Sequence, residues 1–468
     1  MNNASLRSNT SFNPSQLARR DSDRLAAYRE NLDFYSGSQW QQSSRNRQLV
    51  FNYAKVAIDK VTSYLMQGLN FACYPREADS SQLSAVRRAE QLLREVYQQN
   101  NLQQLDWETE IDTAILGDGC YKVIWDAEEK RVRVTAPDIT GIYAWWHGDD
   151  RAKVWRVTSR YTLTQDEVEM LYNIAISRKS AVITEVWTSK DFGLFLDNEL
   201  IQSKPNPYGF IPFIIFPNLR EPKRFWGTSD IPSLVQPQRE LNRALSQLSR
   251  ILELSGNPIA VLENVGSAED IKVQPGAVWT IPEDARAYLL DLLQGGGIRL
   301  HIDYIDLIYR CLHDLSETPR AAYGSMEREL SGTALNVELS SLIQKVARKR
   351  TIRTDAYHQR AEMILRLAAR YHPGAGGFDG ITHRVVWGPI LPQDAARQAQ
   401  NEQLLVQAGV HSRRTAMDEM GIMNPDEEFN RWLEERRRIL LMNQEFKAVS
   451  TRGGARERAV AAEMEVPE

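Results

Sequence analysis

Cysteine is scarce in this sequence of 468 residues, and its distribution excludes one class of protein. The three cysteines, Cys73, Cys120 and Cys311, are odd in number and scattered along the chain. Small secreted domains held by disulfides carry even numbers of cysteines at short spacings. The sequence therefore predicts no disulfide framework, which agrees with assembly in a reducing cytoplasm.

Motifs that bind nucleotides or metals are also missing. The sequence has no G-x-x-x-x-G-K-[ST] loop, and Gly295-Gly296-Gly297 lacks the lysine and hydroxyl residue that would complete one, so we interpret it as a hinge. His301 and His313 lie more than about three turns apart on one predicted helix, too far for a shared metal. There is no H-E-x-x-H motif and no G-x-S-x-G elbow. We expect no catalytic activity, no cofactor and no metal.

Long apolar runs and a strong excess of one charge are absent as well. No run is long enough to span a membrane, and residues 1–13 are polar, so we expect neither membrane insertion nor a signal peptide. The chain has 57 basic and 61 acidic residues, a net charge of −4. This balance argues against a chain that binds polyanions strongly over its whole surface.

The residues that are present predict an α+β protein of about two to four domains. Hydrophobic residues make up 42% of the chain, enough for a substantial core. Helical periodicity is followed by strand alternation in the first half. Helices are predicted over residues 15–37, 53–66, 81–99 and 102–116, and strands over 120–125, 132–134, 153–161, 180–188, 192–196 and 210–216.

Residues 227–335 predict two long helices joined by a small β-rich tip. Asp230 and Pro232 fit the first turn of the outgoing helix, and Gly256-Asn257-Pro258 ends it. The tip contains strand patterns at 259–262, 277–281 and 287–290, and a return helix ends near Thr318-Pro319. The apolar residues expected to pack this pair of helices are Leu241, Leu245, Leu248, Leu252, Ile302 and Ile305.

Such a stalk is too thin to bury its own apolar stripes. Copies of the chain arranged side by side in a ring or bundle would cover them. An ordinary helical hairpin packed on its own domain is the alternative, and the pattern alone does not separate the two.

A long basic helix is predicted over residues 333–371. Its charged residues Lys345, Arg348, Lys349 and Arg353 fit either a collar that faces phosphate or a solvated helix face, and we favour the solvated face. One further strand is predicted at Val385-Val386-Trp387, and the chain becomes helical again from Gln393. A last amphipathic helix is expected to run to about Met442.

Four short motifs follow one another in a fixed order. They are Gly117-Asp118-Gly119-Cys120-Tyr121, Pro207-Tyr208-Gly209-Phe210-Ile211-Pro212-Phe213, Gly227-Thr228-Ser229-Asp230-Ile231 with Leu241-Asn242, and Ser331-Gly332-Thr333-Ala334-Leu335. Together they resemble the portal proteins of tailed, siphovirus-type bacteriophages. The first two are similar to recurrent wing elements of that family, the third resembles the start of its stem, and the fourth resembles its SG-x-A-L signature. The resemblance extends from about residue 53 to about residue 435.

The resemblance implies a division of the chain into wing, stem, clip and crown. It implies a ring, typically of 12 subunits, at one capsid vertex of the virion, assembled in the host bacterial cytoplasm. The ring would be the channel for packaging and ejection of double-stranded DNA. The implied segments are a disordered N-terminus at 1–13, the wing at 14–226, stem helices at 227–256 and 295–321, the clip at 257–294, a tunnel loop at 322–332, the long wing helix and strand at 333–392, and a crown with a disordered tail at 393–468.

The resemblance also implies partners and surfaces. The partners are other copies of the chain, DNA bound without sequence specificity, the terminase large subunit, a head-completion or adaptor protein, and the major capsid and scaffolding proteins. A conduit for DNA needs a bore that is not heavily basic, because each phosphate contact strengthens binding and resists sliding. The implied DNA-facing residues of the tunnel loop are Tyr323, Met326, Glu327, Arg328 and Glu329, and the implied contact residues of the clip are Leu262, Trp279 and Tyr288.

Two alternatives from other classes remain. Another ring-forming head–tail connector component would usually be far smaller than this chain. A metal-dependent DNA-processing enzyme would require a compact set of carboxylates, and the sequence offers only dispersed acidic residues.

Overall fold

The computed structural model describes residues 12–38, 49–75, 83–256, 259–264, 283–290, 297–324, 332–372, 377–378, 380–391, 395–422 and 425–442. The chain divides into two compact units, Met1–Met66 with Gln91–Phe378, and Gln67–Glu90 with Asp379–Glu468. Helices and antiparallel sheets occur together, which confirms the predicted α+β class.

Two antiparallel sheets form the body of the first unit. The smaller sheet has the strand order β3-β2-β9, and the larger has the order β4-β5-β6-β7-β8. The sequence predicted six of these strands and missed β4 and β8. The bounds are β2 Asp118–Asp126, β3 Arg131–Thr135, β4 Ile142–His147, β5 Asp150–Thr164, β6 Ser180–Thr188, β7 Asp191–Leu196, β8 Glu199–Pro205 and β9 Phe213–Pro217.

The three-stranded sheet is covered on both faces. On one face, Cys120 and Phe213 join Val157 and Ile183 of the larger sheet in one apolar cluster. On the other face, Tyr121 stacks on a neighbouring strand's phenylalanine and lies against α10 (Ser340–Tyr371). Side chains alternate between the two faces of a strand, so β2 supplies both interfaces. The body therefore has three layers, a helix and two sheets.

Further helices of the first unit surround this body. The bounds are α1 Leu17–Arg20, α2 Ser22–Ser36, α3 Tyr53–Leu65, α5 Leu102–Leu116 and α6 Gln165–Tyr172, while α4 covers Leu83–Gln99. The predicted helices are confirmed, and α5 has the predicted bounds. The buried residues of α5 include the apolar Leu102, Ala114 and Ile115 and also four polar side chains, those of Asp106, Thr109, Glu110 and Thr113.

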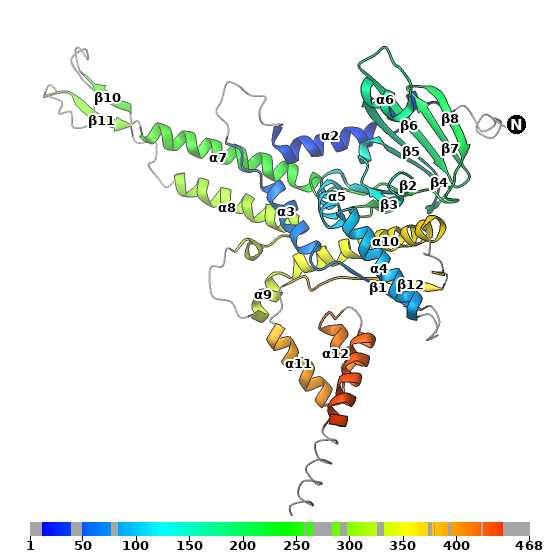
Figure 1. Ribbon diagram of the computed structural model, residues 1–468. Coiled ribbons are helices and arrows are strands. Elements are labelled where there is room, and N and C mark those ends of the chain that lie inside the picture. The colour runs from blue at the N-terminus through cyan, green and yellow to red at the C-terminus, as the bar shows by residue number, and fades with distance from the viewer. Residues whose placement is uncertain are drawn as a thin grey trace, which may run out of the picture. The chain divides into compact units, whose positions relative to one another are not determined.

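A two-helix arm leaves the body and carries a small hairpin. Figure 1 shows α7 and α8 running alongside each other to the pair β10 and β11. A short 3-10 turn at Pro232–Leu234 precedes α7, so the proline lies at the first helical position, where no backbone donor is needed. The bounds are α7 Val235–Gly256, β10 Ile259–Glu263, β11 Arg286–Leu290, α8 Gly297–Ser316 and α9 Gly332–Glu338, the last separated from α10 by Leu339. The strand predicted at 277–281 lies outside the described residues.

The second unit contains a small sheet and helices. Strand β1 (Asn70–Pro75) pairs antiparallel with β12 (Ile381–Val386). The sequence predicted a strand near Val385 but missed β1. Helices α11 (Ala395–Gln407) and α12 (Arg413–Glu419) and a helix over residues 425–442 follow. The predicted last helix is confirmed.

Candidate functional site

The base of the arm is built from two glycine-containing turns in close contact. The amide of Gly227 donates to the Asp118 carboxylate at 2.8 Å, and the Ser229 hydroxyl donates to the carbonyl of Ala114 at 3.1 Å. A Cβ atom on Gly227 would lie 2.5 Å from the Gly117 carbonyl oxygen, so only glycine fits there. The two sequence motifs that contain these glycines therefore meet at the point where α7 begins.

The half of the arm nearer its base is packed into the body. Leu241 and Ala244 of α7 and Ile308 and Leu312 of α8 lie in one buried cluster with side chains of α2, α3 and α5. Leu245 and Ile305 are partly buried against the same cluster. This half of the arm thus obtains its hydrophobic contacts from its own chain, as the helical-hairpin alternative predicts.

The arm also exposes large apolar side chains, and they lie on more than one face of α8. Leu300 is 72% exposed, Leu307 is 54% exposed and Ile302 is 52% exposed, and Leu252 of α7 is also exposed. A single exposed leucine is ordinary, but several on one pair of helices mark a surface that another protein covers. Of the six predicted packing residues, Leu241 is buried, Leu245, Leu248 and Ile305 are half-buried, and Leu252 and Ile302 are exposed.

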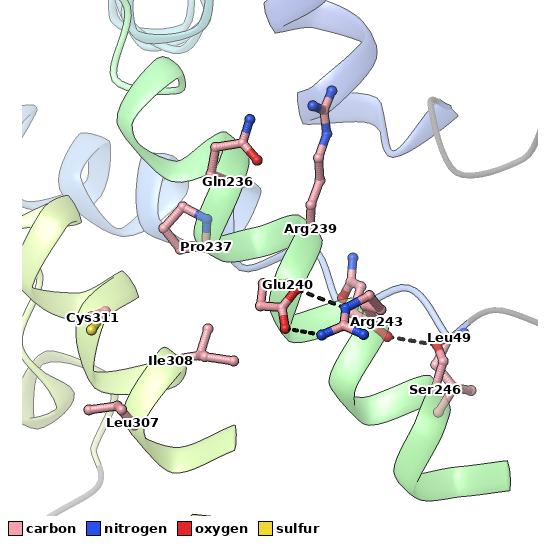
Figure 2. A pocket seen from close by; sticks show the side chains of 11 residues that line it. Leu49, Gln236, Pro237, Arg239, Glu240, Arg243, Ser246, Leu307, Ile308 and Cys311 are labelled. Atoms are coloured by element: carbon pink, nitrogen blue, oxygen red, sulfur yellow. Dashed lines mark hydrogen bonds and ion pairs between the residues drawn. The ribbon is translucent and has the colours of Figure 1, made fainter. Parts of the chain in front are cut away.

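A groove of about 630 Å³ lies along this arm. Figure 2 shows side chains of α7 and α8 around it, with Glu240 and Arg243 bonded to each other on the α7 side. The Tyr304 hydroxyl also donates to Glu240, at 2.8 Å. The lining residues are Leu49, Gln236, Pro237, Arg239, Glu240, Asn242, Arg243, Ser246, Leu307, Ile308 and Cys311. Its floor is apolar at Leu307 and Ile308 and its rim is charged.

Beneath the arm, a buried ionic network joins the start of α7 to α10. Asp230 lies 2.6 Å from the Lys349 ammonium and 3.2 Å from that of Lys345, and all three side chains are buried. The Asn218 side-chain carbonyl accepts from Lys349 at 2.7 Å. Burial alone would raise the pKa of Asp230, but the two lysines outweigh it and hold that pKa well below its usual range.

Two buried arginines extend the network along α10. Arg353 forms a double hydrogen bond with the Glu110 carboxylate at 2.7 and 2.8 Å and donates to the Pro217 carbonyl. Arg360 forms a double hydrogen bond with the Asp106 carboxylate. Asp106 and Glu110 are one turn apart on α5, so two carboxylates on one helix face meet two guanidinium groups on another.

The favoured interpretation of the basic helix, a solvated face, is wrong for three of its four residues. Lys345, Lys349 and Arg353 are buried and paired with acidic side chains, and a buried cation cannot contact a phosphate of DNA. Arg348 is half-exposed and pairs with Glu317 at 2.6 Å. The cations at 345, 349 and 353 repeat every four residues, which places them on one face. That spacing was the one sequence feature that could have indicated their burial, but many surface helices share it.

Only the first residue of the predicted DNA-facing set in the tunnel loop lies within the described residues. Tyr323 is half-buried, and its hydroxyl donates to the Thr318 side chain at 3.1 Å. The His313 ring bonds to the Thr318 carbonyl at 2.6 Å, and burial lowers the pKa of this histidine. The remaining residues of the set, Met326, Glu327, Arg328 and Glu329, lie outside the described residues.

The predicted clip contacts are only partly described. Tyr288 of β11 is 46% exposed, and its hydroxyl donates to Glu263 across the hairpin at 3.2 Å. The backbone of Leu262 in β10 pairs with that of Ala287, and the structure does not describe the Leu262 side chain. Trp279 lies outside the described residues.

In the described ranges, with their gaps, no group of three or more histidine, cysteine, aspartate or glutamate side chains could hold a metal ion. No described helix is long and apolar enough to cross a membrane.

Comparison with known proteins identifies the family. The sequence model of the family described as "Phage portal protein, SPP1 Gp6-like" matches residues 15–440. The chain therefore belongs to this family of bacteriophage portal proteins, which is structural rather than enzymatic. A comparison with curated proteins found no match.

Proposed function

We propose that this chain is the subunit of a ring, with about 12 copies as the expected number, at one vertex of a bacteriophage capsid. Double-stranded DNA passes through its channel during packaging and ejection. The proposal rests on family membership together with one structural observation, the exposed apolar side chains of α7 and α8. In a ring, each arm lies between the arms of two neighbouring copies, which cover these side chains.

The segments take the roles expected for the family. The body up to residue 226 and the helix after residue 332 form the wing, the arm is the stem, its hairpin is the clip, and residues 393–468 form the crown. The terminase large subunit and a head-completion protein dock at the clip, and capsid and scaffolding proteins contact the ring's outside. Assembly takes place in the host cytoplasm, and the finished ring is part of the virion.

The buried ionic network supports a rigid connection between stem and wing. Asp230 stands at the start of the stem and Lys345 and Lys349 stand on the helix that follows the tunnel loop. A force on the stem would thus be carried into α10 through buried, charge-assisted bonds. The tunnel loop joins the same two elements and is the part of the chain that we place nearest to DNA.

Deletion of residues 325–330 tests the conduit role. Ala322 is buried and Tyr323 bonds to Thr318, so the deletion starts beyond these anchored residues. We expect rings to form normally and the yield of packaged DNA in an in vitro packaging assay to fall at least tenfold. Normal packaging by the deleted protein would contradict the role of the loop, and failure to form rings would show that the loop is structural.

A further inference from the structure

A cleft of about 540 Å³ lies at the edge of the three-stranded sheet, beside β9. Strand β9 pairs with β2 on one side, and no described strand pairs with its other side. The cleft is bounded by β9, by the first residues of β5, by Phe225 in the segment before α7, and by α10. Its size is within the range of clefts that hold ligands.

The backbone of β9 presents unused hydrogen-bonding groups to this cleft. The Pro212 carbonyl accepts a hydrogen bond from the amide of Val123 at 3.0 Å. This carbonyl therefore points toward β2. Backbone groups alternate in direction along an antiparallel strand, so those of Phe213 and Ile215 point away from β2. In the described part of the chain, the amides and carbonyls of these two residues form no hydrogen bond. An open strand edge of this kind is a template for pairing with another strand.

The charges of the cleft favour an acidic occupant. Arg151, Lys153 and Arg220 line it, and none of them forms an ion pair with a described residue. Asp355 is the one carboxylate among the lining residues, and it bonds to Gln359 of its own helix. Arg151 and Lys153 lie close together in the first residues of β5, and both side chains line the cleft.

We propose that this cleft binds an extended, acidic segment of a partner protein by strand addition to β9. The peptide groups of Phe213 and Ile215 pair with the backbone of the incoming segment. Acidic side chains of the segment then face Arg151 and Lys153, and its apolar side chains pack on Phe225 and its neighbours. The proposal concerns the wing and is independent of ring formation.

A synthetic peptide tests the recognition directly. The probe is a fluorescein-labelled peptide, Ser-Glu-Val-Glu-Val-Glu-Val-Ser, titrated with the full chain and followed by fluorescence anisotropy. We expect it to bind, and a counterpart with lysine in place of each glutamate to bind at least tenfold more weakly. A peptide N-methylated on every glutamate and valine cannot donate backbone hydrogen bonds from either edge and should also bind at least tenfold more weakly.

Variants of the chain locate the site. Arg151→Glu with Lys153→Glu should weaken peptide binding at least tenfold, while Lys130→Glu, an exposed lysine that does not line the cleft, should leave it unchanged. Ile215→Pro removes one of the edge amides without breaking a bond to β2 and should weaken binding, whereas Ile215→Val should not.

Three results would overturn the proposal. The first is absence of peptide binding. The second is equal binding of the N-methylated and unmodified peptides, which would indicate a site for anions rather than for a strand. The third is a DNA duplex that displaces the peptide and binds Ile215→Pro as well as the unaltered chain, because the cleft would then be a site for nucleic acid. The N-methylated peptide keeps the test decisive even if Ile215→Pro fails to fold.

Discussion

Asp230 and Lys349 form a buried ion pair of 2.6 Å although they are 119 residues apart in the sequence. Asp230 immediately precedes the first turn of the arm, and Lys349 lies in the middle of α10. The pair therefore holds the arm at the position from which α7 leaves the body.

Removing the charge of Asp230 should destabilise the chain strongly. Asp230→Asn removes the carboxylate that pairs with Lys345 and Lys349, and Glu110 is then the acidic side chain left near Lys349. Breaking a buried ion pair in this way costs about 3–5 kcal/mol of stability. The free energy of unfolding, from urea denaturation, measures the loss. The double variant Asp230→Asn with Lys349→Met should lose less than the sum of the two single variants. Additive losses would contradict a direct interaction.

The stability of the chain should depend on the protonation of Asp118. Burial raises the pKa of this carboxyl to about 6, although the Tyr28 hydroxyl and the Gly227 amide both donate to it. A carboxyl with a raised pKa in the folded state binds protons more readily there than in the unfolded chain. Its contribution to stability is therefore present below about pH 4 and is lost as the pH rises to about 6, a change of about 3 kcal/mol.

Asp118→Asn isolates this contribution, because asparagine does not titrate in this range. The free energy of unfolding should be measured at pH 4 and pH 7 for both proteins. Relative to the unaltered chain, the variant should gain stability between pH 4 and pH 7. Asp230 contributes in the opposite direction, since its low pKa removes stability as the pH falls, and it does so equally in both proteins. A difference between the proteins that is the same at both pH values would contradict the assignment.

A charge at an exposed apolar position of the arm should prevent assembly without unfolding the subunit. Leu307 is 54% exposed in the single chain, so Leu307→Glu should change its free energy of unfolding by less than about 1 kcal/mol. At an interface between copies, the buried carboxylate would cost several kcal/mol. Native mass measurement should then find subunits rather than rings.

The matched control is Leu171→Glu on α6, because Leu171 is 56% exposed and lies outside the arm. This variant should assemble like the unaltered chain. Equal assembly of both variants would mean that Leu307 does not lie in an interface between copies. Leu245→Asp is a poorer test, because Leu245 packs partly into the chain's own core and the change would also destabilise the subunit.

Elements with a clear periodicity were predictable from the sequence. Strand β6 and helix α5 have the predicted bounds because each is a regular pattern that ends at a turn. Strand β8 was missed because it is mostly exposed, with little hydrophobic alternation. Strand β1 obtains its partner from β12, far along the chain, so its local pattern did not identify it.

The buried charges were not predictable in the same way. Lys349 and Arg353 lie on one face of a helix, a spacing that a solvated surface also produces. Their partners, Asp230 and Glu110, come from two other elements, and only the tertiary structure brings them together. The close contact between Gly117 and Gly227 likewise became evident only in three dimensions, although both glycines lie in motifs that the sequence already singled out.

The most direct test of the central claim is the mass of the purified full-length protein under native conditions, combined with negative-stain images. We predict a closed ring of about 12 subunits with a central channel, seen both alone and after addition of the family's scaffolding protein. A stable monomer or dimer in both conditions would contradict the assignment of this chain as a ring-forming channel.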